Sequence, residues 1–333
     1  MLASALFSVI WAAGVGLVLI GLGCGLIYVA QGGQMARDFL NSATVHFNGL
    51  LVFATGYGLL GYVRSTGRSL LAQLTQIVHL PPNAQEMLAH LGARIAAWRA
   101  TNYIAVPLTV VGALVLWSCG YPLAGFARLY LAFWTTSIYY VASAILAFYV
   151  YVIALFRFVE EHAEIVTLQR PSLVRRVQVL DEFLIISATM GVLAIYFGFR
   201  GTLTANFVHV DAISQDLLML PLLFYVPTTL LYSFYPRFVL RQMLEEDVVR
   251  MTEDLERRIF EQRHADLKDE LELRHLVMEI KTRALAERRA IPLLSLKDAP
   301  SLTISILILI QFILHRDAVI ASFLSQAFHP GGR

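Results

Sequence analysis

Long apolar runs alternate with short polar segments along the first 235 residues of the chain. A helix needs about 20 mainly apolar residues to cross the hydrocarbon core of a bilayer. The pattern therefore predicts an all-α fold, a polytopic membrane helical bundle of about six spans occupying residues 1–235. The first run is longer than a signal-peptide core, so we expect it to be a retained span. The six expected spans lie near 5–29, 45–63, 103–125, 129–156, 183–199 and 216–235.

The arginines between these runs predict the orientation, because short cytoplasmic loops carry an excess of positive charge. The segment 64–102 holds four arginines and a single acidic residue, whereas the alternate connections are poor in positive charge. We therefore expect the segment 64–102 and the N-terminus to be cytoplasmic. Within this loop Asn83 and Glu86 form a helix-start signature ahead of an amphipathic pattern. Such a helix suits either the headgroup boundary of the membrane or a packing role against other cytoplasmic helices.

A strongly charged segment follows the sixth run. The chain has 26 basic and 24 acidic residues, and 27 of these fall within 236–298. Neither Gly nor Pro occurs between Arg237 and Ile291, and apolar residues recur at spacings of three and four, which predicts a long helix. We expect this segment to be cytoplasmic.

The apolar stripe of this charged segment lapses near residues 263–266 and then resumes. A hydrophobic stretch follows later and must return to the membrane. We therefore expect residues 236–290 to form a cytoplasmic helical hairpin or coiled coil rather than a straight rod. In this hairpin Leu255 and Ile259 are expected to face Leu271 and Met278.

The last part of the chain, residues 291–333, contains the apolar stretch SLTISILILIQFIL at 301–314. This stretch is short for a full span, and the ionisable residues 315–317 interrupt it before apolar residues resume. Ionisable groups at the middle of a bilayer are costly. We expect a hydrophobic C-terminal helix that dips into the membrane or packs against the bundle.

Composition supports a membrane protein, since 57% of the residues are hydrophobic and only 15% are charged. The expected location is the cell inner (plasma) membrane, with several passes, and the lipid bilayer is the first expected partner. A formal net charge of +2 does not suggest a nucleic-acid partner. Cys24 and Cys119 lie in separate apolar runs and do not indicate a disulfide.

The stretch TGYGLLGY at 55–62 resembles two functional motifs by its letters alone. A dinucleotide-binding turn requires a preceding strand and a βαβ unit, and neither pattern is present. A potassium-channel filter requires the order TVGYG and a position near the outer face, whereas here Thr55 stands one place too late and Arg64 follows closely. We therefore interpret the stretch as a helix-packing seam in which Ala54, Gly58 and Gly61 share one face. Gly21 and Gly25 form a matching small-residue pair in the first span.

Two other features of the spans are candidates for a functional role. The fourth span carries a polar stripe that either lines a water-filled path or hydrogen-bonds neighbouring helices. The sixth span and its exit contain prolines, which remove backbone donors and favour a hinge. The candidate pore-lining residues are Thr136, Tyr140, Ser143 and Tyr151, and the candidate hinge residues are Pro221, Pro227 and Pro236.

Motifs of enzyme chemistry are missing from the sequence, which contains no HExxH, CxxC, phosphate loop or GxSxG. The cluster EEHAE at 160–164 and the pair His209 and Asp211 lack a fixed metal-ligand spacing. We therefore expect no catalytic residue, no cofactor and no metal. A membrane-embedded enzyme acting on lipid is the weaker alternative.

The centres of the six expected spans contain no Asp, Glu, Lys or Arg, which disfavours an ion-coupled transporter. The leading hypothesis is a homo-oligomeric passive channel or pore that is regulated by its cytoplasmic helical region. The alternative is a non-conducting membrane scaffold or signal transducer that recruits a cytoplasmic protein partner through residues 236–290.

Overall fold

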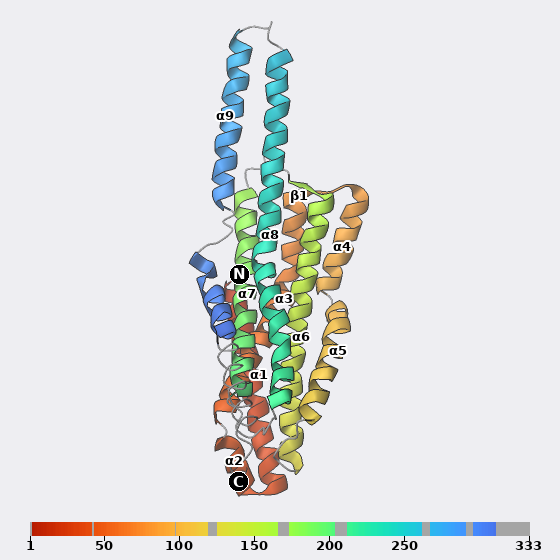
Figure 1. Cartoon of the computed structure of the whole chain (residues 1–333), viewed down its shortest axis with the longest axis vertical. Helices are drawn as coiled ribbons and strands as arrows, with labels where there is room; N and C mark the ends of the chain where they lie inside the picture. The colour runs from red at the N-terminus through yellow and green to blue at the C-terminus, as the bar shows by residue number, and fades with distance from the viewer. Residues whose placement is uncertain are drawn as a thin grey trace, which may run out of the picture.

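The computed structural model of the chain shows an elongated bundle of helices (Figure 1). The part that it describes is almost entirely α-helical, so the expected all-α class is confirmed. It describes residues 2–41, 43–96, 98–118, 125–165, 173–203, 212–261, 267–290 and 296–310. The elements are α1 (Leu2–Gln31), α2 (Gly33–Asn41), α3 (Ala43–Ile77), β1 (Val78–His79), α4 (Pro82–Ala96), α5 (Trp98–Ser118), α6 (Gly125–His162), β2 (Glu164–Ile165), α7 (Leu173–Leu203), α8 (Ala212–Glu261), α9 (Leu267–Ala290), the 3₁₀ turn η1 (Leu296–Asp298) and the helix Ala299–Ile310.

The core of the bundle lies between α3, α6, α7 and α8. Large side chains on the inward faces of these helices pack together in the core. Several of the aromatic residues there have no exposed surface at all. Tyr62 of α3 stacks on Phe183 of α7, with ring centroids 5.4 Å apart. Each buried aromatic side chain packs a large surface against its neighbours, and this packing contributes to the stability of the bundle. The largest fully buried aromatic side chains are Tyr62, Tyr149, Phe156, Phe183 and Tyr232.

The short strands β1 and β2 join the ends of α3 and α6 at one end of the bundle. They pair antiparallel, with Val78 opposite Ile165 and His79 opposite Glu164. The second half of α8 and all of α9 extend beyond this end, side by side (Figure 1). Since α9 runs back towards the bundle, the two helices form an antiparallel pair, and the residues 263–266 expected at its turn lie outside the described part of the chain.

Three of the described helices are long and apolar enough to cross a membrane. They cover Leu2–Gln31, Thr136–His162 and Arg176–Gly198. The helices Gly33–Asn41 and His46–Gly67 meet at a bend of 65° and together could form a fourth. The six expected spans therefore stay a prediction. Among the described residues, the apolar helices Thr101–Leu114 and Ala299–Ile310 are shorter than a full span.

The seam between α8 and α9 differs from the expected one. Leu271 and Met278 are 61% and 70% exposed, so they do not lie in the seam. Among residues 270–282 of α9, the buried ones are instead Val277 and Ile280, which lie on another face of the helix. The spacing of apolar residues in α9 fits two faces of the helix, so the prediction that Leu271 and Met278 face α8 was wrong.

Candidate functional site at Arg237

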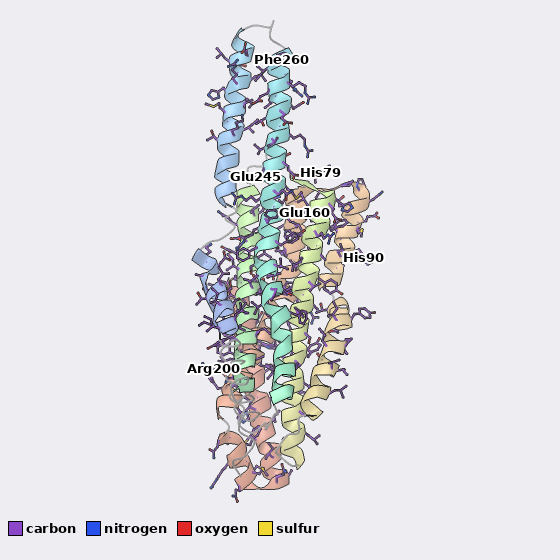
Figure 2. The ribbon with its side chains drawn as sticks, viewed as in Figure 1. His79, His90, Glu160, Arg200, Glu245 and Phe260 are labelled. Carbon is purple, nitrogen blue, oxygen red and sulfur yellow. The ribbon has the colours of Figure 1, made fainter. Side chains whose placement is uncertain are left out.

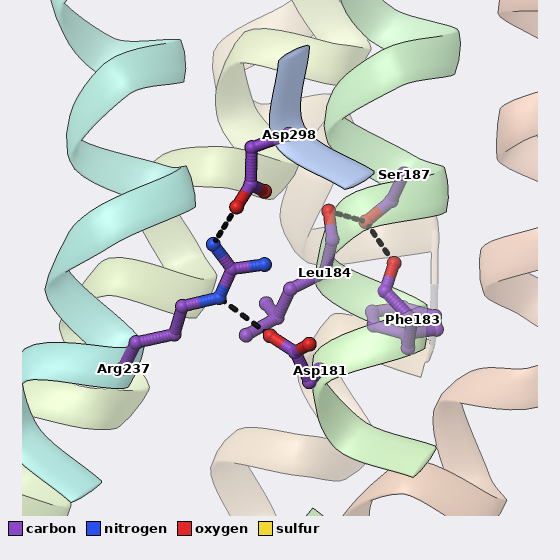
Figure 3. A network of polar contacts seen from close by, with 6 residues as sticks. All are labelled: Asp181, Phe183, Leu184, Ser187, Arg237 and Asp298. Carbon is purple, nitrogen blue, oxygen red and sulfur yellow. Dashed lines mark hydrogen bonds and ion pairs between the residues drawn. The ribbon is translucent and has the colours of Figure 1, made fainter. Parts of the chain in front are cut away.

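The most unusual buried group in the described part of the chain is the guanidinium group of Arg237 on α8. Only 1% of the residue is exposed. Its Nε donates to Asp181 Oδ1 of α7 at 2.5 Å, and its Nη1 donates to Asp298 Oδ2 of η1 at 2.7 Å (Figure 3). We call these three residues the Arg237 cluster. A buried charge of this kind requires paired and hydrogen-bonded partners, and the two carboxylates supply them.

The sequence places Arg237 and Asp181 on apolar helix faces. Arg237 shares its face with Leu240 and Leu244, at spacings of three and seven residues. Asp181 shares its face with Leu184 and Ala188 in the same way. Residues at such spacings lie on one side of a helix, so the packing of α7 against α8 brings the opposite charges together.

Asp298 brings a third segment of the chain to the cluster. It directly precedes the helix Ala299–Ile310, where a carboxylate is favoured by the helix dipole. Pro300 is tolerated in the first turn because its missing N–H would have no partner within the helix there. Ser301 Oγ donates to the Asp298 carbonyl at 3.0 Å, and Ile308 joins the buried core. The segment that follows α9 is therefore fastened to the bundle at Asp298.

A cluster of hydroxyl groups lies beside the Arg237 cluster in the same helices. The Tyr149 hydroxyl donates to the Ser187 carbonyl at 2.9 Å, and Ser187 Oγ hydrogen-bonds the Tyr232 hydroxyl. The rings of Tyr149 and Tyr232 stack with centroids 4.1 Å apart. These three fully buried residues tie α6, α7 and α8 together one to two helical turns from Arg237.

Gly191 allows this hydroxyl cluster to form. A Cβ at this position would overlap the Tyr149 hydroxyl and approach the Tyr225 hydroxyl to 3.1 Å. Any larger residue would force the buried phenol groups apart. The close approach of α7 to α6 and α8 thus depends on one glycine.

A further contact joins α6 to α8 at the end of the bundle from which the hairpin extends. The Tyr235 hydroxyl donates to Glu160 Oε2 at 2.5 Å. Glu160 and Glu245 both lie towards this end, whereas Arg200 lies towards the other (Figure 2). Together with the β1–β2 pair and the Arg237 cluster, this hydrogen bond fixes the base of the α8–α9 pair.

The candidate pore-lining residues of α6 differ in how far they are buried against neighbouring helices. The Tyr140 hydroxyl donates to Asn102 Oδ1 of α5 at 2.7 Å, and Ser143 is buried. Thr136 and Tyr151 are half-buried. The Tyr140 bond matches the interhelical alternative that the sequence left open for this stripe.

The candidate hinge residues Pro221, Pro227 and Pro236 all lie within α8, which continues as one helix through them. Hydroxyl side chains accompany the prolines: Thr229 Oγ1 donates to the Tyr225 carbonyl, and Ser233 Oγ donates to the Thr229 carbonyl, both at 2.9 Å. Pro236 is buried directly before Arg237. A hinge at these prolines stays a prediction.

The stretch at 55–62 is helical throughout its length in α3. Its carbonyl groups therefore do not form the extended loop of an ion filter or the turn of a nucleotide site. A Cβ on Gly58 would lie 3.0 Å from the Val9 Cα of α1, and one on Gly61 would lie 3.5 Å from Ser8 Oγ. Ala54 is also buried, whereas Gly21 and Gly25 have no neighbouring atom within 4 Å of such a Cβ.

The candidate metal ligands of the sequence fall in two places along the chain, only one of which the structure describes. Within them no group of three His, Cys, Asp or Glu side chains is arranged to hold a metal ion. Glu160 of the EEHAE cluster accepts the Tyr235 hydrogen bond, and the ring Nδ1 of His162 lies 3.1 Å from the Phe158 carbonyl oxygen. His209 and Asp211 lie outside the described residues.

Sequence reasoning missed the Arg237 cluster for an identifiable reason. All three residues lie within a few positions of the ends of apolar runs, where charged residues are usually assigned to loops or headgroups. The available signal was that Arg237 and Asp181 fall on apolar faces of predicted helices. Comparison of the chain with protein-family models, with curated proteins and with solved structures finds no match.

Proposed function

We propose that this protein is an integral membrane signal transducer or scaffold. In this proposal the helical bundle anchors the protein in the inner (plasma) membrane, with both ends of the α8–α9 hairpin on the cytoplasmic side. The hairpin moves with the bundle and recruits a cytoplasmic protein partner. The expected six spans and their orientation belong to the same proposal.

The Arg237 cluster is the observation that carries this proposal. It joins the outgoing helix α8 to Asp298, which lies on the segment returning from α9, and to Asp181 of α7. Both ends of the hairpin are therefore fastened to the same point of the core. A displacement of the hairpin is transmitted to α7, because a buried ion pair is costly to separate.

Packing of the core supports a transducer over a pore through a single protomer. The space between α6, α7 and α8 is occupied by stacked aromatic rings and by hydroxyl groups that bond to each other. A water-filled path would require these groups to separate. The coupling of helices is the simpler role for such a packed region.

A channel between copies of the chain is the second candidate. It is favoured by one observation, that Thr136 and Tyr151 on the polar stripe of α6 are only half-buried within one protomer. A second copy could complete a path along this stripe. Ion flux into liposomes, blocked by a thiol reagent in a Thr136→Cys variant but not in the unsubstituted protein, would establish this alternative.

The direct test of the transducer proposal is cross-linking in intact cells. We expect the full-length protein to capture a reproducible soluble partner through photo-reactive side chains on the hairpin, and to give no ion flux in liposomes. The matched variant Arg237→Met/Asp181→Leu/Asp298→Leu, which replaces the whole cluster with apolar groups, should stay folded but lose partner capture. Equal capture by this variant, or ion flux without any partner, would contradict the proposal.

A further inference from the structure

The α8–α9 hairpin extends beyond the bundle (Figure 1). In this part it carries exposed apolar side chains. On α8 these are Val249 and Phe260, which are 53% and 70% exposed. On α9 the two most exposed are Leu271 and Met278, at 61% and 70%, ahead of Leu276 at 43%. The region is too highly charged to lie in lipid, so these side chains meet water unless another protein surface covers them.

These four side chains form two stripes, one on each helix. Val249 and Phe260 are eleven residues apart, about three helical turns, and Leu271 and Met278 are seven residues apart, about two turns. Each pair therefore lies on one side of its helix. On α9 this side is distinct from the seam side, which contains the buried Val277 and Ile280.

An ion pair shows that the two stripes lie on the same side of the hairpin. Lys281 Nζ of α9 lies 3.3 Å from Glu256 Oε1 of α8. Glu256 precedes Phe260 by four residues, and Lys281 follows Met278 by three, so each charged residue belongs to the stripe of its own helix. We call the surface formed by Val249, Glu253, Glu256 and Phe260 of α8 with Leu271, Arg274, Met278 and Lys281 of α9 the hairpin face.

Charges on the hairpin face are divided between its two helices. The α8 stripe contains the acidic residues Glu253 and Glu256, and the α9 stripe contains the basic residues Arg274 and Lys281. The acidic stripe of one hairpin is therefore complementary to the basic stripe of another. A surface with this property is complementary to itself under a twofold rotation.

We infer that the hairpin face binds the hairpin face of a second copy of this chain. A twofold axis parallel to the hairpin places α8 of one copy against α9 of the other, antiparallel, and forms a four-helix bundle. Because Glu256 and Lys281 lie level within one hairpin, Phe260 then lies level with Met278 of the partner copy and contacts it, with Glu256 beside the partner copy's Lys281. The same axis keeps both copies in one membrane orientation. The inference depends only on the hairpin and not on the proposed function.

The test measures distances between hairpins in the full-length protein in liposomes. Cys24 and Cys119 are replaced with serine, and a single spin label is placed at Glu279, an exposed α9 residue outside the hairpin face. A single label reports a distance only between two copies. We expect a narrow distance distribution for the otherwise unsubstituted chain.

Three variants then separate this face from the rest of the hairpin. Met278→Glu puts an acid opposite the acidic stripe and should abolish the narrow distance, whereas Met278→Lys should preserve more of it. Leu276→Glu is the matched control, because Leu276 is an exposed apolar residue of α9 outside the face, and it should leave the distance intact. Circular dichroism should show unchanged helix content in all three.

The inference would be overturned by any of three results. The first is no distance between copies in the unsubstituted chain, which includes the case in which a soluble partner occupies the face. The second is a distance that persists in Met278→Glu. The third is an equal loss in Leu276→Glu and Met278→Glu.

Discussion

The two halves of α8 lie in different surroundings. From Tyr225 to Leu244 the helix contributes a large share of the buried core, including Tyr232 and Arg237. From Glu245 to Phe260 only Thr252 is buried. The first half is held by contacts on several sides, and the second by one seam with α9. We therefore expect the free energy of local opening to be high in the bundle and much lower in the hairpin.

Packing and charge therefore contribute differently to the stability of the bundle and of the hairpin. In the bundle, stability depends on the fit of aromatic rings, a glycine and one buried ion-pair cluster. In the hairpin, the ion pairs are exposed at the surface, where each contributes about 0–1 kcal/mol. Changes of equal size in the two regions should therefore have very different effects.

The largest effect is expected at Arg237. Arg237→Ala leaves the buried Asp298 and the partly buried Asp181 without their cation, which should lower the free energy of unfolding by about 3–5 kcal/mol. The control is Arg241→Ala, because Arg241 pairs with Glu245 on the partly exposed side of the same helix. Thermal unfolding in detergent measures both. Similar midpoints for the two variants would show that the buried cluster does not stabilise the bundle.

A smaller loss is expected at the contact of α1 with α3. Gly58→Leu would drive a side chain into the Val9 backbone, and overpacking of this kind costs about 1–3 kcal/mol. Gly21→Leu is the matched control, since nothing lies within 4 Å of a Cβ at that position. Unfolding of the purified protein in detergent provides the comparison. If Gly21→Leu destabilises the protein as much as Gly58→Leu does, the loss at Gly58 does not come from the tight α1–α3 contact.

Ser187 should have a still smaller effect on the bundle. Ser187→Ala removes a hydroxyl that bonds Tyr232, and a single hydrogen bond contributes about 1 kcal/mol. Thr228→Ala serves as the control, because Thr228 Oγ1 donates to the Phe224 carbonyl of its own helix in an exposed position. Chemical unfolding curves of the two variants would be compared. No difference between Ser187→Ala and Thr228→Ala would argue against a stabilising role for the hydroxyl cluster.

The smallest effect on the bundle is expected from the hairpin seam. Ile280→Asp places an unpaired charge between α8 and α9, which should open the hairpin locally. Hydrogen exchange should become faster at amides of α9 while the amides of α7 keep their protection. His275→Asp, at an exposed position of α9, should leave the exchange rates of both α9 and α7 unchanged. Faster exchange throughout α7 would show that the two regions do not differ in the way described.

The sequence allowed the helical class, the apolar helices and the existence of a charged helix to be predicted, because these depend on periodicity and composition. It did not allow the correct face of α9 to be predicted, since Leu271 and Met278 repeat as regularly as Val277 and Ile280 do. Nor did it reveal the Arg237 cluster. Asp181, Arg237 and Asp298 are far apart in the chain, and only the packing of three segments brings them together.

Glycines illustrate the same limit. Gly58 and Gly61 were expected at a helix contact from their spacing, and the structure places them beside Val9 and Ser8 of α1. Gly191 carried no such signal, because its role depends on the phenol groups of two other helices. Local spacing identifies a face, but the partner of that face is a property of the tertiary structure.

The most direct test of this account measures whether Arg237 fastens the return segment to α7. Spin labels at the exposed residues Gln178 of α7 and Thr303 of the helix Ala299–Ile310 report the distance between these elements. The full-length protein in liposomes, with Cys24 and Cys119 replaced by serine, should give a narrow distance distribution. The Arg237→Met variant should give a broad distribution shifted to longer distances, since Asp298 loses its partner. An unchanged narrow distribution in Arg237→Met would contradict the account.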